Sequence, residues 1–183
     1  MGRPSQVVVL AEDHRHQRFV YWYLRRLGRT RHEIRNEDLP ARRGCGEQWV
    51  RDRYANAVAA FRARTARAAT EFIVAIDADN GDVNRRLRQL ETALKQADLA
   101  SRGPEERIVH LIPKWNIEAW IVCLSGDQID EDYRDYSRVR DIDGRIATAA
   151  ATLYEWGRPN TTPPPHCSPS LLAAISELRR LDK

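Results

Sequence analysis

The chain has 183 residues, of which 42% are hydrophobic and 31% are charged, and its formal net charge is +4. This length suits one domain that can bury a sizeable core, and no apolar run approaches the ~18 residues that a membrane span needs. The first residues show no secretory pattern, and the three cysteines are widely spaced and form no CxxC or zinc pattern, so we expect a cytoplasmic protein.

The first part of the chain contains the patterns of two strands and two helices. Residues 6–11 are apolar and β-branched, which predicts a buried strand, and a helix is expected to follow as far as Leu27, with Gly28 ending it. Residues 31–37 show a weaker strand pattern. A second helix is predicted over about 47–68, because apolar side chains recur there at helical spacing.

The middle part of the chain continues this alternation. A short apolar run at 72–76 predicts another buried strand, and a helix is expected over about 83–99. Residues 107–112 predict a further strand, which Pro113 closes. The following segment, 114–124, would be apolar almost all round as a helix, which indicates a buried one.

The remainder of the chain is more varied. Residues 126–144 are rich in aspartate and irregular in pattern, and we interpret them as a solvated surface loop or insertion. Helices are predicted over about 144–156 and 169–181. The Pro-rich segment 157–169 lies between them and is expected to be a stiff connector.

Strands that alternate with helices predict an α/β fold with a mainly parallel central sheet. We expect about four strands, helices on both faces, and additional C-terminal helices. An α/β core is predicted over residues 1–125. Residues 126–183 would then supply the acidic loop, a helix, the Pro-rich connector and a C-terminal helix packed on that core.

Three acidic residues directly follow two of the predicted strands: Glu12 follows the first, and Asp77 and Asp79 follow the strand at 72–76. They meet at one edge if those strands are neighbours, because sites in parallel sheets form at the carboxyl ends of strands. Crowded carboxylates raise each other's pKa, and a divalent cation relieves their repulsion. The pattern predicts an Mg²⁺ or Mn²⁺ site suited to phosphoryl transfer. Capping a helix or shaping a turn is the alternative role for the two aspartates.

Other motifs fit less well. The stretch DADNGD resembles a calcium-binding EF-hand loop, but Gly81 comes one position early and Arg88 stands where the bidentate glutamate belongs. The chain contains neither a P-loop nor a GxGxxG motif. The start VVVLAEDH resembles a receiver domain with Asp77 as phosphoacceptor, although Asp77 comes late for that fold and no Met-Pro-x-x-Asp-Gly loop follows it.

A glutamate after the first strand, followed later by a strand ending in Asp-x-Asp, resembles the signature of the Toprim fold. The glycine that usually follows the first glutamate is Asp13 here. The stretch IPKWNIEAWIVCL resembles the helix of OLD and RloB-like Toprim proteins on which a glutamate joins the site, and that glutamate would be Glu118. The chain therefore resembles the small stand-alone Toprim nuclease subunits of prokaryotic defence or mobile-element loci.

The resemblance implies a metal-dependent nuclease with a Toprim-like sheet that hydrolyses phosphodiester bonds, with DNA as the favoured substrate. It also implies a separate ATPase as partner in a phage defence system. In this interpretation Glu12, Asp77 and Asp79 hold Mg²⁺ or Mn²⁺, with Glu12 also catalytic. Glu118 would complete the site or act as base, and Lys114 would stabilise charge that builds on the phosphate. A simple Lys114–Glu118 ion pair, one helical turn apart, is the alternative.

Arginine supplies all but three of the 30 basic residues, and its guanidinium binds phosphate in a bidentate manner. We expect Arg15, Arg18, Arg42 and Arg43 to contact the nucleic-acid backbone, although a solvated arginine face is the plainer interpretation. The Asp13 departure and the small size also favour a second hypothesis. In that hypothesis the chain is a non-catalytic Toprim-like subunit that binds a partner protein or DNA.

Overall fold

The structure is a computed structural model that describes residues 6–41, 45–79, 82–133, 136 and 138–182. Within these residues four parallel strands form one sheet in the order β2-β1-β3-β4. The strands are β1 (Gln6–Ala11), β2 (Ile34–Asn36), β3 (Thr70–Ala75) and β4 (Ile108–Leu111). The two central strands pair along their whole length, from Gln6 with Thr70 to Ala11 with Ala75.

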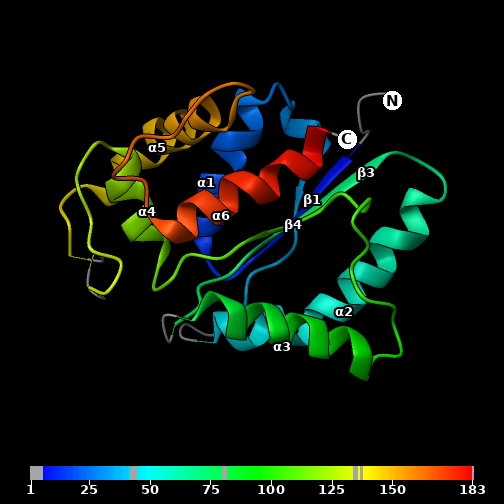
Figure 1. The fold of residues 1–183 in the computed structure, drawn as a ribbon. Coiled ribbons are helices and arrows are strands. Elements are labelled where there is room, and N and C mark those ends of the chain that lie inside the picture. The colour runs from blue at the N-terminus through cyan, green and yellow to red at the C-terminus, as the bar shows by residue number, and fades with distance from the viewer. Residues whose placement is uncertain (1–5, 42–44, 80–81, 134–135, 137, 183) are drawn as a thin grey trace.

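Helices cover both faces of this sheet (Figure 1). The helices are α1 (His14–Arg26), α2 (Gly46–Thr65), α3 (Val83–Gln96), α4 (Ile117–Leu124), α5 (Ile142–Gly157) and α6 (Pro169–Leu178). Two short 3-10 turns are also present: η1 (Arg31–Glu33) precedes β2, and η2 (Arg179–Asp182) follows α6. The helices α2 and α3 lie on one face, and α1, α4, α5 and α6 lie on the other.

Two hydrophobic cores result from the alternation of side chains along the strands. Val7 and Val9 of β1 face the core shared with α1, α4, α5 and α6. The alternate residues of the same strand, Val8 and Leu10, face the core shared with α2 and α3. Because both faces of the sheet are covered, β3 is buried from end to end, as the apolar run at 72–76 predicts, and its first two residues, Thr70 and Glu71, are buried although they are polar.

The predicted fold class is confirmed, since the chain forms an α/β fold with a four-stranded parallel sheet, helices on both faces and further C-terminal helices. This arrangement is consistent with a Toprim-like fold. In the described part of the chain, no helix has the length and apolar character that crossing a membrane requires.

Some element boundaries differ from the prediction. The segment predicted as a strand over 31–37 divides into η1 and a three-residue β2, because Glu33 closes a capping box with Thr30. The buried helix begins at Ile117 and not at 114, since the Asn116 side chain accepts a hydrogen bond from the backbone N–H of Ala119 and caps it there.

Most described residues of the acidic segment are exposed, as predicted, but two of its acids contact the C-terminal helices. Glu131 accepts hydrogen bonds from the backbone and hydroxyl of Ser170 at the start of α6. Asp127 forms an ion pair with Arg145 of α5 at 3.0 Å. These contacts join the segment to the two C-terminal helices. The first of them, α5, packs against α1 and α4, and the second, α6, packs against β4.

Candidate metal centre

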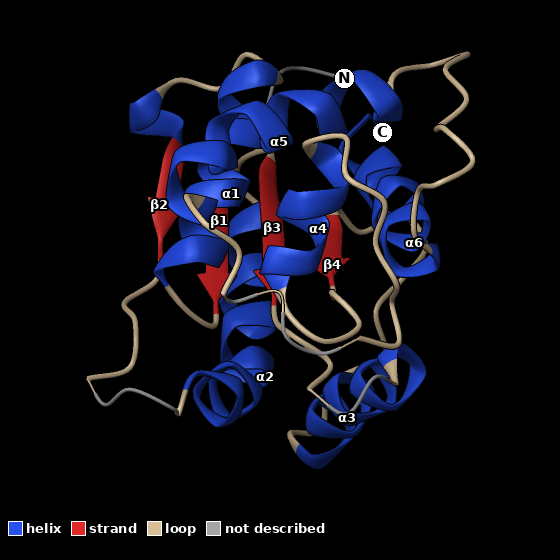
Figure 2. Cartoon of the chain, turned by 90° about the vertical axis from the view of Figure 1, so that its left-hand side faces the viewer, coloured by secondary structure: helices blue, strands red, loops and turns tan. Residues whose placement is uncertain are grey.

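The candidate site lies where the order of the strands reverses. The chain leaves β1 toward β2 on one side, and returns to place β3 on the other side of β1 (Figure 2). Connections on opposite faces diverge at such a point and leave a crevice at the carboxyl ends of the strands, where ligands of α/β proteins bind. Glu12 follows β1 there, and Asp77 stands two residues after β3.

Glu12 and Asp77 meet with His16, and their potential ligand atoms all lie within 4.8 Å of one another. The backbone N–H of Asp77 donates to Glu12 Oε2 at 3.0 Å. The fully buried ring of His16 bridges two aspartates, with Nε2 2.9 Å from Asp77 Oδ1 and Nδ1 2.8 Å from Asp13 Oδ1. The prediction that the first and third strands bring their acids together is confirmed for Glu12 and Asp77.

Burial and neighbouring charges shift the pKa values of this cluster. Burial, reinforced by the charge of Asp77, raises the pKa of Glu12 from its ordinary 4.5 to about 7. Burial also raises the pKa of Asp77 to about 6, although His16 opposes the shift. Burial alone would lower the pKa of His16, but Asp77 and Asp13 raise it well above its usual value, so the ring donates to both carboxylates.

Asp13 has a defined role although a glycine was expected at its position. Its side chain caps α1 by accepting from the backbone N–H of His16, and it also holds the His16 ring. Burial alone would raise the pKa of Asp13, but the hydrogen bond from His16 lowers it to about 2, so the carboxylate stays charged. Close backbone approach occurs instead at Gly46, where an added Cβ would lie 2.5 Å from the Glu12 carbonyl oxygen.

Asp79 does not join the three-residue cluster in this structure. Its φ of 55° is left-handed, so the extended backbone of the strand does not continue as far as Asp79. The Asp79 carboxylate instead accepts from Arg86 Nη2 at 3.3 Å. Its negative charge still raises the pKa of Glu12, which places it in the neighbourhood of the site.

Glu118 lies near the cluster, in the first turn of α4. It is 7% exposed, and its charge helps to raise the pKa of Asp77. Its partner is Arg15, whose Nη1 donates to Glu118 Oε1, so the alternative Lys114–Glu118 pair is wrong. Lys114 pairs instead with Asp132 of the acidic segment, at 2.6 Å.

The arginines predicted to contact nucleic acid fall into two groups. Arg15 and Arg18 both lie on α1 and form ion pairs with Asp143 of α5, at 3.1 Å and 3.3 Å. Asp143 therefore neutralises part of the positive charge expected on this side of the helix. Arg42 and Arg43 lie outside the described residues.

Sequence reasoning missed two residues of the site, His16 and Arg86. The Arg86 guanidinium is 3% exposed, and it donates to the carbonyl oxygen of Asp77 at 2.9 Å and to the Glu47 carboxylate of α2. Each residue occupies the apolar stripe of its helix, His16 one turn before Phe19 and Val20, and Arg86 one turn before Leu90. A polar residue on such a stripe, close to acidic strand ends, was the available signal.

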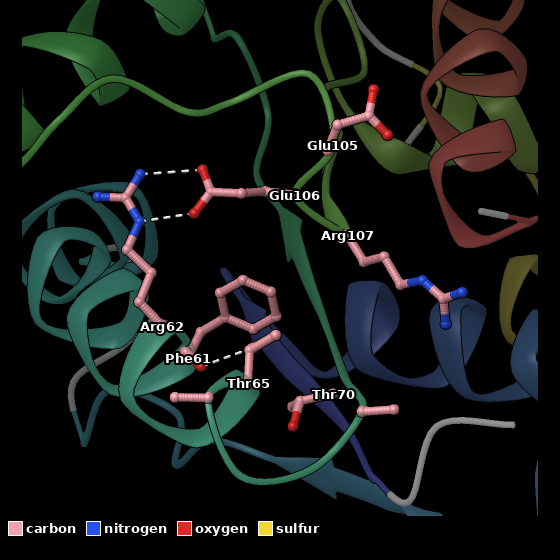
Figure 3. Close-up of a pocket in the computed structure, with 9 residues that line it drawn as sticks. Phe61, Arg62, Thr65, Thr70, Glu105, Glu106 and Arg107 are labelled. Carbon is pink, nitrogen blue, oxygen red and sulfur yellow. Dashed lines mark hydrogen bonds and ion pairs between the residues drawn. The ribbon is translucent and has the colours of Figure 1, made fainter. Parts of the chain in front are cut away.

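A separate hollow of about 650 Å³ lies at the opposite end of the sheet (Figure 3). It is bordered by the start of β3 at Thr70 and by Arg107, which precedes β4. The Arg62 guanidinium and the Glu106 carboxylate face one another there in a two-bonded ion pair. With their charges paired at the amino ends of the strands, these residues take no part in the cluster at Glu12.

Comparisons with known protein families, with curated proteins and with solved structures found no match to this chain.

The geometry itself fits a divalent cation. The hydrogen bonds described above engage one oxygen of each central carboxylate, Glu12 Oε2 and Asp77 Oδ1. Within the described part of the chain, the second oxygens, Glu12 Oε1 and Asp77 Oδ2, accept no hydrogen bond. Two carboxylate oxygens are thus left for a hard cation, and His16 orients one of the two carboxylates through its hydrogen bond to Asp77 Oδ1.

Proposed function

We propose that this chain is a metal-dependent nuclease of Toprim type that hydrolyses phosphodiester bonds in nucleic acid, with DNA as the favoured substrate and Mg²⁺ or Mn²⁺ as cofactor. The observation that supports it most is the pairing of Glu12 with Asp77 at the reversal point of the sheet. Burial raises the pKa of both groups, the charge of Asp77 adds to the shift at Glu12, and a cation would relieve that cost.

Glu12 and Asp77 would hold the ion, which would supply Lewis-acid activation of a phosphoryl oxygen and of water. His16 orients Asp77 through its hydrogen bond, and Asp13 in turn orients His16. Asp79 remains a proposed ligand, and it would have to leave Arg86 to reach the ion.

Glu118 is our proposed base, and Arg15 beside it would be shared with a substrate phosphate. Lys114 would contact the phosphate only after separating from Asp132. Apart from Glu12, the acids and cations of the proposed mechanism thus form ion pairs in this structure. On substrate binding, the cations would leave these acids to contact phosphate oxygens, and water would take their place at the acids.

The test is plasmid cleavage with Mn²⁺ or Mg²⁺ by the wild type, by Asp77→Ala/Asp79→Ala, and by the isosteric variants Glu12→Gln and Asp77→Asn. Asp127→Asn is the matched control, because Asp127 is an exposed acid that pairs only with Arg145 among the described residues. We expect the site variants to lose cleavage and the control to retain it. Equal cutting by wild type and site variants would refute the assignment of the site.

The second candidate is a non-catalytic subunit that keeps the fold and binds a partner protein or DNA. The observation that favours it is that most acids of the site already have a cation nearby: Asp77 contacts His16, Glu118 contacts Arg15, and Asp79 contacts Arg86. Titration calorimetry separates the two candidates. Heat of binding at millimolar Mn²⁺ supports the nuclease, and its absence supports the non-catalytic subunit.

Two further proposals concern partners and chemistry. The ATPase partner implied by the Toprim resemblance is tested by adding the product of a neighbouring ATPase gene to the cleavage assay. The receiver-domain hypothesis requires phosphorylation of Asp77, which is 8% exposed and hydrogen-bonded to His16. Incubation with acetyl phosphate, followed by mass analysis of Asp77, tests it directly.

A further inference from the structure

The solvent-facing side of α1 carries a row of aromatic and basic side chains that the proposed chemistry does not use. His14, Arg18, Trp22 and Arg25 recur every three or four residues and therefore lie along one side of the helix. All four are exposed, and Trp22 retains 40% of its surface in solvent. We call this row, together with Tyr21 and Arg26, the outer face of α1.

The aromatic rings on this face are held in place by their neighbours. Tyr21 and Trp22 meet edge to face, with ring centroids 5.4 Å apart. The guanidinium of Arg25 lies 6.0 Å from the centroid of the Tyr21 ring, at the limit of a cation–π contact. These contacts restrict the rings and leave a large part of the Trp22 surface open to a flat ligand.

Two hollows lie beside the outer face of α1. One, of about 280 Å³, is lined by residues that include Arg18, Tyr21 and Arg31. The other, of about 370 Å³, is lined by Trp22, Arg25, Arg26 and small residues of α5. An extended chain lying along the helix would therefore find space on either side of the aromatic pair.

The charge on this face is positive and largely uncompensated. Among the described residues no carboxylate lines either hollow. Arg18 pairs with Asp143, but Arg25, Arg26 and Arg31 form no ion pair with a described acid. The face therefore suits a polyanion better than a protein surface, which would have to bring its own acids to meet three guanidinium groups.

The row also leads toward the candidate metal centre. His14 stands next to Asp13 at the carboxyl edge of the sheet, and Arg25 lies eleven residues further along the helix. At 1.5 Å per residue the row is about 17 Å long. A strand bound along α1 would thus have one end near Glu12 and Asp77.

We propose that the outer face of α1 binds single-stranded nucleic acid, with a base stacked on Trp22 and phosphates held by Arg25, Arg26 and Arg31. An exposed indole stacks most readily on an unpaired base, because the bases of a duplex already stack on one another and would have to be unstacked first. The path of the strand to the metal centre rests on the proposed nuclease function, whereas the binding itself does not.

The experiment measures binding of a fluorescent oligonucleotide of about 12 nucleotides, single-stranded or as a duplex, in the presence of EDTA so that no metal chemistry contributes. The variants are Trp22→Ala, Trp22→Phe and Arg25→Ala/Arg26→Ala. Tyr133→Ala is the matched control for an exposed aromatic, at 55% exposure. Arg88→Ala/Lys95→Ala removes two equally exposed cations from α3 on the other face of the sheet.

We expect Trp22→Ala to weaken single-strand binding about fivefold or more and to change duplex binding less, while Trp22→Phe keeps most of the affinity. Arg25→Ala/Arg26→Ala should lower the slope of log affinity against log salt by about 1.4. Both controls should bind within about twofold of wild type. Matching thermal unfolding of all variants shows that each one is folded.

Unchanged single-strand affinity in folded Trp22→Ala and Arg25→Ala/Arg26→Ala would overturn the proposal, even if the protein cuts DNA. That result would assign the outer face of α1 to a protein partner or to solvent. The opposite result is also informative. If binding depends on this face but the protein cuts nothing with Mn²⁺, the proposed binding surface is supported and the proposed nuclease function is refuted.

Discussion

At the scale of single residues, the Glu12 carboxyl imposes a cost on folding at neutral pH. Its pKa rises to about 7 in the folded protein from an ordinary 4.5, mainly through burial. The folded state then binds the proton more tightly than the unfolded state, so stability falls as the pH rises from about 4.5 to 7. A shift of this size corresponds to about 3 kcal/mol.

We therefore expect Glu12→Gln to be more stable than the wild type at pH 8 without metal, by up to about 3 kcal/mol, and nearly equal to it at pH 4. Urea unfolding at the two pH values measures the difference. Glu155→Gln is the control, because it makes the same substitution at a side chain that is 58% exposed on α5. A Glu12→Gln variant that is less stable at pH 8 would contradict the cost assigned to burial.

Gly46 provides a second test at the residue scale. An added Cβ would lie 2.4 Å from Glu12 Cγ and 2.5 Å from its carbonyl oxygen, and the backbone atom cannot simply rotate away. Gly46→Ala should therefore destabilise the protein by about 1–3 kcal/mol and weaken Mn²⁺ binding by displacing Glu12. Gly157→Ala should be neutral or slightly stabilising, because an added Cβ there would have no heavy atom within 4 Å beyond its chain neighbours and the backbone of its own helix. Equal behaviour of the two variants in denaturant titrations would argue against close packing at Glu12.

At the scale of elements, Arg86 connects α3 to the end of β3 and to α2. Its guanidinium contacts the Asp77 carbonyl, Asp79 and Glu47 while it is almost fully buried. Arg86→Ala should cost about 3 kcal/mol in urea unfolding, because the buried carbonyl and two acids lose their common partner. Arg88→Ala, whose side chain is 69% exposed, should cost under about 0.5 kcal/mol. A small loss for Arg86→Ala would mean that the loop after β3 is held by other contacts.

The elements themselves were largely predictable from hydrophobic pattern. The buried strands β1, β3 and β4 and the helices between them follow from apolar runs and helical spacing, which local sequence encodes directly. The sequence placed Asp79 together with Glu12 and Asp77, because the hydrophobic pattern does not reveal that the backbone becomes left-handed after the strand. His16 and Arg86 were missed because periodicity assigns a residue to a face of a helix but does not identify what that face meets.

At the scale of the whole molecule, the site depends on which strands are neighbours. The order of the strands along the chain is compatible with several spatial orders in the sheet. The observed order, β2-β1-β3-β4, is what places Glu12 beside Asp77. The C-terminal part contributes as well, since Asp143 of α5 neutralises Arg15 and Arg18 on α1. That long-range pairing results from the packing of α5 on α1, which no local signal in either segment reveals.

Metal binding should act on the molecule as a whole, because an ion that binds only the folded state stabilises all of it. At a free concentration one hundred times its dissociation constant, the gain is about 2.7 kcal/mol. For a domain of this size that gain corresponds to a rise of about 5–10 °C in Tm. We expect thermal unfolding in Mn²⁺ to show this rise and EDTA to reverse it. Asp77→Asn should abolish the rise and Asp127→Asn should keep it. A rise that persists in Asp77→Asn would place the ion elsewhere, and no rise at millimolar Mn²⁺ would favour the non-catalytic subunit.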